Sequence, residues 1–223
     1  MVDRPILFSG PMVRALLDGR KTQTRRELYS LRAIKDGLVP RTAAIATGVD
    51  KNGVQFAYQF PRTYGVDRYY AISPWFSVRK GDRLWVRESW LKPFANTDTG
   101  SKAERAGYIY RADGPEYLDR AAQKHQWGKE AKWKVSIHMP REASRLTLTV
   151  TDVRVERLQS ISKNDVMAEG CHERDGLPLV DVHAGWHEPY AALWDKINGV
   201  GAWEVNPWVV AVTFTVEHRN IDA

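Results

Sequence analysis

The chain has 223 residues, of which 43% are hydrophobic, and it carries a formal net charge of +6 at neutral pH. This composition predicts a single domain over 1–223 with a real core, and no apolar run approaches the roughly 18 residues that a membrane-spanning helix needs. One cysteine, Cys171, excludes an internal disulfide and, with an N-terminus unlike a signal peptide, predicts a cytoplasmic protein of unknown oligomeric state.

The first predicted elements are a short strand near residue 5 and a helix over 11–18. In this helix Met12 and Leu16, with Ala15 beside them, fall on one face. Gly19 follows the helix directly, where a left-handed residue suits the C-terminal cap. The helix is therefore expected to end at Gly19.

A basic segment, Gly-Arg-Lys-Thr-Gln-Thr-Arg-Arg, occupies 19–26. If it is extended, Thr22 and Thr24 share one face and Lys21 points the opposite way. If the chain instead turns tightly after the helix, Lys21 folds towards Thr24. A lysine beside a hydroxyl is one way to activate a nucleophile without histidine. A solvated basic loop explains the same residues.

The remaining predicted elements follow in chain order. They are a strand after the Lys-Gly-Asp turn at 80–82, a long β-branched strand over 146–156, a helix capped by Ser162, a helix over 187–197, and a strand over 207–216. The helix over 187–197 is expected to have one apolar face, with Tyr190, Leu193, Trp194 and Ile197 on it. The segments 28–77 and 95–140 read as two long insertions. Few helices, several short strands and no βαβ rhythm favour an α+β fold built on a small barrel with flanking short helices.

A metal site is weighed for the short region that contains Cys171, His172, His183 and His187. Such ligands hold zinc if the loop between them folds back. However, the last two histidines enclose a glycine and precede the predicted helix, so we expect no metal and no cofactor. A zinc base deaminase is excluded more firmly, because its Pro-Cys-x-x-Cys motif needs two cysteines.

The order of these elements resembles the ASCH domain, a family with a β-barrel similar to the PUA RNA-binding domain. The resemblance rests on Gly-Arg-Lys-Thr-x-Thr-x-Arg after a helix, the Lys-Gly-Asp turn before a strand, and the long strand that leads into a short helix. It covers 5–27, 79–94 and 146–216. The opening Pro-Ile-Leu-Phe-Ser-Gly-Pro-Met-Val is similar to long versions of the family in phages and prophages.

The resemblance also implies an activity. Small bacterial members of the YqfB type are amidohydrolases that remove the acetyl group from N4-acetylcytidine and related N4-acylated cytosines. Their lysine, threonine and glutamate correspond to Lys21, Thr24 and Glu169, with Glu173 as the alternative glutamate. By this resemblance Thr24 attacks the amide carbonyl, Lys21 accepts the threonine proton, and Glu169 orients Lys21 or protonates the leaving cytosine.

Substrate contacts are predicted around this site. Arg20 and Arg26 suit a phosphate or a base, and Arg87, Glu88 and Trp90 form a possible base-binding wall by stacking, although core packing explains them equally. Arg25 stands where the family has an aliphatic residue, which makes the cation cluster denser. The predicted partner is a modified nucleoside or base. The rival interpretation is an RNA-binding module or ribonuclease of the PUA-like class.

Overall fold

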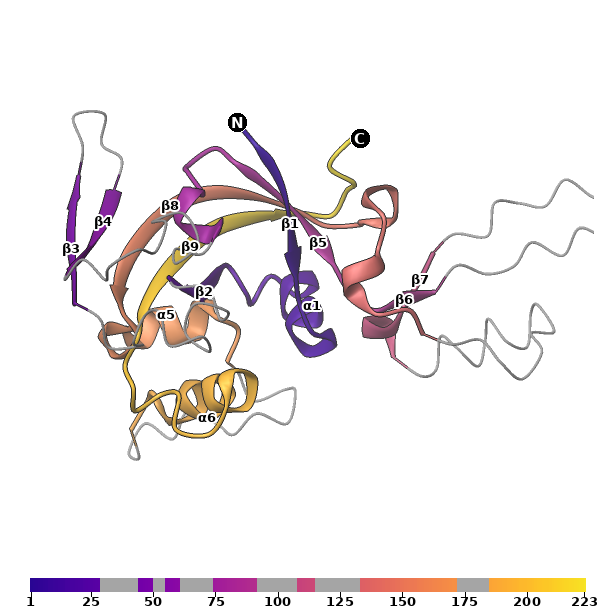
Figure 1. Cartoon of the computed structure of the whole chain (residues 1–223). Coiled ribbons are helices and arrows are strands. Elements are labelled where there is room, and N and C mark those ends of the chain that lie inside the picture. Colours follow the sequence, from indigo (N-terminus) through magenta and orange to yellow (C-terminus); the bar gives the residue numbers. More distant parts are fainter. Residues whose placement is uncertain (29–43, 50–54, 61–73, 92–107, 115–132, 172–184) are drawn as a thin grey trace, which may run out of the picture. The chain divides into compact units, whose positions relative to one another are not determined.

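The computed structural model describes residues 1–28, 44–49, 55–60, 74–91, 108–114, 133–171 and 185–223 (Figure 1). Helices and strands are mixed, as predicted, and five strands form a sheet in the order β1-β5-β8-β9-β2. β1 is parallel to β5, whereas β2 is antiparallel to β9. The fold is therefore α+β with a mixed sheet.

The strands and helices have the following bounds: β1 Asp3–Leu7, α1 Gly10–Leu17, β2 Gln23–Glu27, β3 Ala44–Val49, β4 Gln55–Phe60, β5 Arg83–Arg87, β6 Trp90–Leu91, β7 Ile109–Tyr110, β8 Thr147–Arg157, α5 Lys163–Ala168, α6 Glu188–Asn198 and β9 Trp208–Glu217. β3 pairs with β4, and β6 with β7, as two separate antiparallel ribbons. Short 3₁₀ turns lie among them, including Leu158–Ser160 just before α5.

The expected barrel is not confirmed. In the described part of the chain the sheet does not close, because β1 and β2 are its two outer strands. The two predicted insertions lie mostly outside the described residues, and the parts that are described contain the β3–β4 ribbon and β7. No described helix has the length and apolar character needed to cross a membrane.

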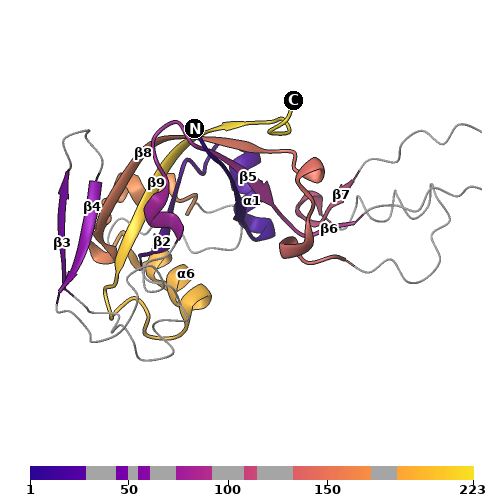
Figure 2. The same ribbon diagram turned by 45° about the horizontal axis from the view of Figure 1, so that its top comes forward.

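The chain divides into two compact units, each assembled from separate segments. The first unit comprises Met1, 19–82 and 149–215, and the second comprises 2–18, 83–148 and 216–223. β2, α5 and α6 belong entirely to the first unit, which Figures 1 and 2 show from two directions. All contacts described below lie within one unit or the other.

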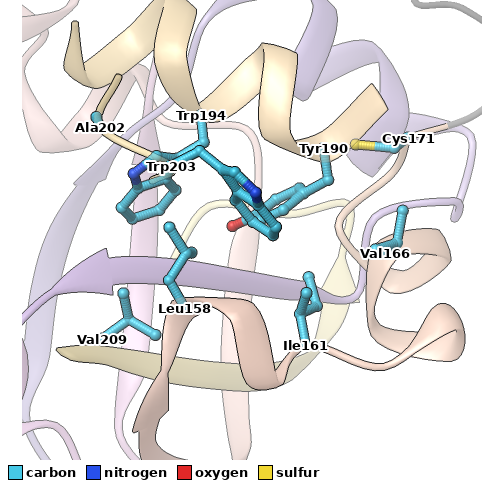
Figure 3. Packing of buried hydrophobic residues seen from close by; sticks show 9 residues of the cluster. All are labelled: Leu158, Ile161, Val166, Cys171, Tyr190, Trp194, Ala202, Trp203 and Val209. Atoms are coloured by element: carbon cyan, nitrogen blue, oxygen red, sulfur yellow. The ribbon is translucent and has the colours of Figure 1, made fainter. Parts of the chain in front are cut away.

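The core of the first unit is an apolar cluster that α5, α6 and β9 build together (Figure 3). We call it the α6 cluster; its buried members are Leu158, Ile161, Val166, Cys171, Tyr190, Trp194, Ala202, Trp203 and Val209. The helix predicted over 187–197 is confirmed, but one member of its expected apolar face is not buried, since Ile197 is 53% exposed. The buried face is set by Tyr190 and Trp194, which are one helical turn apart.

Helix α1 in the second unit ends where the sequence predicts. Gly19 has a φ of 70°, in the left-handed region that glycine tolerates. The buried face of α1 differs by one residue from the prediction, because Val13 is fully buried together with Leu16 and Ala15 whereas Met12 is only half-buried. The helix begins at Gly10, and Val13 and Leu16 then lie three positions apart on the inner face.

Candidate functional site

Lys21 and Glu169 meet although 148 positions separate them in the sequence. The Lys21 ammonium donates to Glu169 Oε2 at 2.8 Å, to the Glu169 carbonyl at 2.9 Å and to the Gln23 carbonyl at 2.8 Å. Its side chain is completely buried, and that of Glu169 is 4% exposed. Three N–H groups thus meet three oxygen acceptors, which is the arrangement of a protonated lysine beside a carboxylate.

The backbone brings these two residues together. Lys21 and Glu169 form an isolated antiparallel bridge, and the Thr22 amide donates to the Ala168 carbonyl at 2.8 Å. Glu169 is the C-terminal cap of α5, so the end of that helix is joined to the segment that enters β2. The site is therefore fixed by main-chain hydrogen bonds as well as by the ion pair.

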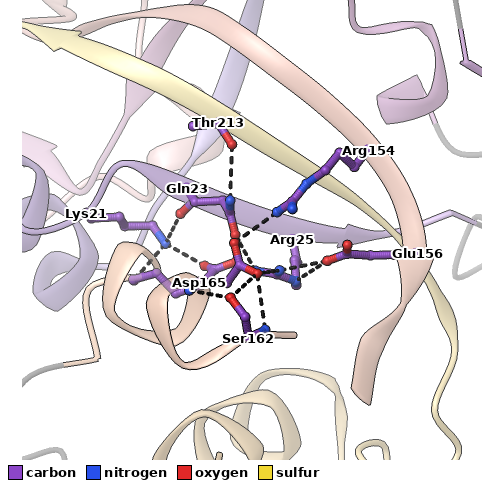
Figure 4. A network of polar contacts seen from close by, with 9 residues as sticks. Lys21, Gln23, Arg25, Arg154, Glu156, Ser162, Asp165 and Thr213 are labelled. Carbon is purple, nitrogen blue, oxygen red and sulfur yellow. Dashed lines mark hydrogen bonds and ion pairs between the residues drawn. The ribbon is translucent and has the colours of Figure 1, made fainter. Parts of the chain in front are cut away.

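Arg25 supplies a second buried cation to the same carboxylate. Its Nη1 lies 3.2 Å from Glu169 Oε1, and its Nη2 lies 2.7 Å from Glu156 Oε1 and 3.3 Å from Asp165 Oδ2. Burial alone lowers the pKa of Arg25, but the charges of Glu169 and Glu156 outweigh burial and raise it. Each oxygen of the Glu169 carboxylate thus faces a cation, Lys21 on one side and Arg25 on the other. Figure 4 shows Lys21 and Arg25 in this network, with the ion pair between Arg25 and Glu156.

Helix α5 is held by Asp165 and Ser162. Ser162 accepts a hydrogen bond from the Asp165 amide while Asp165 accepts one from the Ser162 amide, which is a capping box. Arg154 also donates to Asp165 at 2.9 Å. Burial raises the pKa of Asp165, but the hydrogen bonds from Ser162 and Arg154 prevail and lower it well below its ordinary value. The sequence predicted this cap, and the structure confirms it.

Thr24 lies within β2, and its side chain is 3% exposed. Because side chains alternate along a strand, Thr24 projects to the face of β2 opposite the side chains of Gln23 and Arg25. The carbonyl that receives the Lys21 ammonium belongs to the residue immediately before Thr24. The extended alternative of the two predicted conformations therefore holds for 23–27.

The charge of Glu169 also acts on two other buried groups, the Cys171 thiol and the Tyr190 phenol. Burial raises the pKa of the Cys171 thiol to about 12, with Glu169 adding to the effect. Burial, and then the charge of Glu169, raise the pKa of the Tyr190 phenol well above its ordinary value. Cys171 is therefore a buried thiol in which the reactive thiolate form is disfavoured.

The other predicted contact residues have different surroundings. In the first unit, the Arg26 guanidinium lies 5.5 Å from the centre of the Trp75 ring, and burial lowers its pKa; Arg20 is half-buried. In the second unit, Arg87 donates to the Met139 carbonyl at 3.2 Å. Their contact with a substrate stays a prediction.

Glu88 and Trp90 are core residues of the second unit. Glu88 is 1% exposed and forms two hydrogen bonds with Arg145, at 2.9 and 3.1 Å. Burial raises the pKa of Glu88 despite Arg145. Trp90 is buried against Met139 and Ala143. Glu88 and Trp90 are thus packed in the core, as one of the two alternatives predicted. Their role in stacking against a base stays a prediction.

Among the described residues no group of histidine, cysteine or carboxylate side chains is arranged to hold a metal ion. His172, His183 and the alternative glutamate, Glu173, lie outside the described residues. Comparison of the chain with known protein families, curated proteins and solved structures finds no match. The sequence motif and the geometry around Glu169 are therefore the observations that bear on function.

Proposed function

We propose that this protein is an ASCH-type, PUA-like amidohydrolase that removes the acyl group from N4-acetylcytidine or a related N4-acylated cytosine. The observation that carries the proposal is the buried ion pair between Lys21 and Glu169, at 2.8 Å. The family resemblance implies that both residues belong to one site, although they are far apart in the sequence. A contact with a carboxylate stabilises the ammonium form of a lysine, so Lys21 can act as a base only after it has passed a proton to that carboxylate.

The contact between Lys21 and Glu169 suggests how Lys21 can act as a base. A lysine that donates three hydrogen bonds has no lone pair with which to accept a proton. It gains one when it passes a proton to Glu169 Oε2, 2.8 Å away. Lys21 as a neutral amine then accepts the Thr24 proton while Thr24 Oγ1 bonds to the acyl carbon.

The second half of the step restores both charges. The bond between the acyl carbon and the exocyclic nitrogen breaks, and the Glu169 carboxylic acid gives its proton to that nitrogen, which leaves as the cytosine amine. Lys21 is then an ammonium and Glu169 a carboxylate, as at the start. Water hydrolyses the acyl ester on Thr24 and regenerates the hydroxyl. Because Thr24 and Glu169 are 3% and 6% exposed, the substrate must displace side chains that cover them.

The rival RNA-binding interpretation loses support from the same geometry. Of the cations in the basic segment, Lys21 and Arg25 are both fully buried and neutralised by carboxylates. They offer no charge to a phosphate, and no other observation in the described residues favours nucleic acid over a small substrate.

The test is release of cytidine from N4-acetylcytidine, followed by chromatography. We expect wild-type turnover and its loss in Thr24→Val, which keeps the shape and removes the hydroxyl. Thr22→Val is the matched control, since Thr22 belongs to the same segment and has no role in the step. Turnover that survives in Thr24→Val would reject Thr24 as the nucleophile. The absence of wild-type turnover with any N4-acylcytosine would reject the proposed activity.

A further inference from the structure

The proposed proton transfer from Lys21 needs Glu169 to be ionised, because a carboxyl group that already carries its proton cannot take another from the lysine. Lys21 contacts one oxygen of this carboxylate, Oε2, at 2.8 Å. The other oxygen, Oε1, accepts a hydrogen bond from Arg25 Nη1 at 3.2 Å. The contact at Oε1 therefore bears on both the charge of the carboxylate and the direction of Oε2.

The Arg25 guanidinium is fixed by groups other than Glu169. Arg25 lies in β2, and its side chain is completely buried. Its Nε and Nη2 donate to Glu156 Oε1 at 3.2 and 2.7 Å (Figure 4), and Nη1 donates to the side-chain carbonyl of Gln23 at 2.5 Å. Asp165 Oδ2 lies 3.3 Å from Nη2. Because the planar fork is held at several nitrogen atoms, Nη1 has a fixed position beside Glu169.

Charged groups reach this site from several elements. Lys21 precedes β2 and Arg25 lies in it, while Glu156 of β8 and Asp165 of α5 share Arg25 with Glu169. Burial lowers the pKa of Arg25, but the charge of Glu169 and the contact with Glu156 raise it above its ordinary value. The guanidinium therefore remains a cation beside Glu169.

The groups around this contact add little that titrates at neutral pH. Burial, and then the charge of Glu169, raise the pKa of Cys171 to about 12 and that of Tyr190 well above its ordinary value, so both groups are neutral there. Arg26, the next residue in β2, also responds to the charge of Glu169, although burial lowers its pKa. Arg154 of β8 pairs with Asp165 at 2.9 Å.

We propose that Arg25 is a positioning residue for the proton transfer: by binding Glu169 Oε1 it keeps the carboxylate ionised at acidic pH and directs Oε2 at the Lys21 ammonium. This inference rests on the proposed function. In the step itself an N–H bond of Lys21 Nζ breaks, an O–H bond forms at Glu169 Oε2, and Arg25 keeps all of its protons. A cation beside a carboxylate favours its charged form, typically by about 1–3 pH units. The site is therefore active further into the acidic range than it would be without Arg25.

The test compares two variants that differ only at Arg25. Glu156→Gln removes one negative charge and leaves the contact between Arg25 and Glu169 in place, whereas Arg25→Met combined with Glu156→Gln removes that contact as well. The double variant is preferred to Arg25→Met alone, because it loses one charge of each sign and leaves fewer carboxylates buried without a cation. The measurement is the pH dependence of kcat/KM for N4-acetylcytidine.

We expect the acidic limb of the double variant to lie about 1–3 pH units above that of Glu156→Gln. The limb of Glu156→Gln should lie at or below that of the wild type, because its loss of a carboxylate makes the surroundings of Glu169 more positive. A purely structural Arg25 would change activity by the same factor at every pH. Acidic limbs that coincide in the two variants would therefore overturn this inference alone and leave the proposed function intact.

If the wild type releases no cytidine, the proposed function fails and the Glu169 carboxyl group itself decides the inference. Its side-chain NMR signal in isotope-labelled protein, assigned by its absence from Glu169→Gln, is followed from acidic to neutral pH. A higher titration midpoint in the double variant than in Glu156→Gln supports the role of Arg25 at Glu169. Equal midpoints overturn it.

Discussion

At the scale of single residues, the most unusual feature is a lysine with no exposed surface. Burying an ammonium is unfavourable unless a carboxylate and further acceptors surround it. Lys21 has all of these in Glu169 and two carbonyls. Arg25 contacts the same carboxylate, so the negative charge of Glu169 is balanced by two cations. The cluster is therefore balanced as a whole, and loss of one member leaves another charge buried.

This balance predicts the effect of removing Lys21. We expect Lys21→Met to lower the free energy of unfolding by about 3 kcal/mol, because a buried pair that loses one partner leaves an uncompensated charge. Urea titration at neutral pH measures the change. Lys163→Met is the control, since Lys163 is exposed at the start of α5 and its loss should matter by less than about 0.5 kcal/mol. Equal losses in the two variants would contradict the buried-pair account.

The family resemblance assigns Lys21, Thr24 and Glu169 to one site. From the sequence, Arg25 is predicted only as a member of a dense cation cluster, whereas the structure buries it among three carboxylates. Nothing local predicts this, because Glu156 is 131 positions away.

At the scale of elements, α5 is only six residues long, and its capping box and the backbone bonds at its C-terminal end define it. Helices this short are unstable alone, so the cap and the tertiary contacts decide whether Glu169 is in place. The sequence predicted Ser162 as the cap because a hydroxyl precedes the helical pattern. β8 and β9 were predictable from their β-branched residues, whereas β3, β4 and β7 lie in the segments predicted as insertions.

The cap gives a pH-dependent prediction. Since the pKa of Asp165 is lowered in the folded protein, its contribution to stability is complete above the unfolded pKa of about 3.9 and is lost as the pH falls through the lower folded pKa. We expect Ser162→Ala to cost about 1 kcal/mol at pH 7 and to lose less stability than wild type between about pH 4 and pH 2.

Urea unfolding at several pH values measures this, with Ser160→Ala as the control because Ser160 is exposed in the preceding turn. Parallel pH profiles for Ser162→Ala and wild type would show that the capping box does not hold the Asp165 charge.

At the scale of the whole molecule, the net charge of +6 suggested a nucleic acid partner as readily as a nucleotide. Much of the positive charge is used internally: Arg25, Arg83, Arg141, Arg145 and Arg154 all pair with carboxylates. These pairs cancel within the net charge of +6, so that value does not say how many cations are exposed to phosphates.

We accordingly expect only weak, non-specific binding to a single-stranded oligoribonucleotide, with a Kd no tighter than about 10⁻⁶ M at physiological salt. Fluorescence anisotropy measures it. Nanomolar binding that is lost in Arg25→Met, with stability of that variant checked separately, would restore the RNA-binding interpretation.

The α+β class was predictable because it depends on local patterns along the chain, and the closure of a sheet was not. Closure is decided by pairing between distant strands, and the described strands form an open sheet with β1 and β2 at its edges. The division into two units was likewise not foreseen, because each unit collects segments from three parts of the chain.

The most direct test of the central claim is mass spectrometry of the protein quenched during turnover of N4-acetylcytidine. The account predicts one acetyl group on the peptide that contains Thr24, and none in Thr24→Val. Wild-type release of cytidine without an acetyl group on that peptide, or with one that persists in Thr24→Val, would contradict the role of Thr24 as the nucleophile.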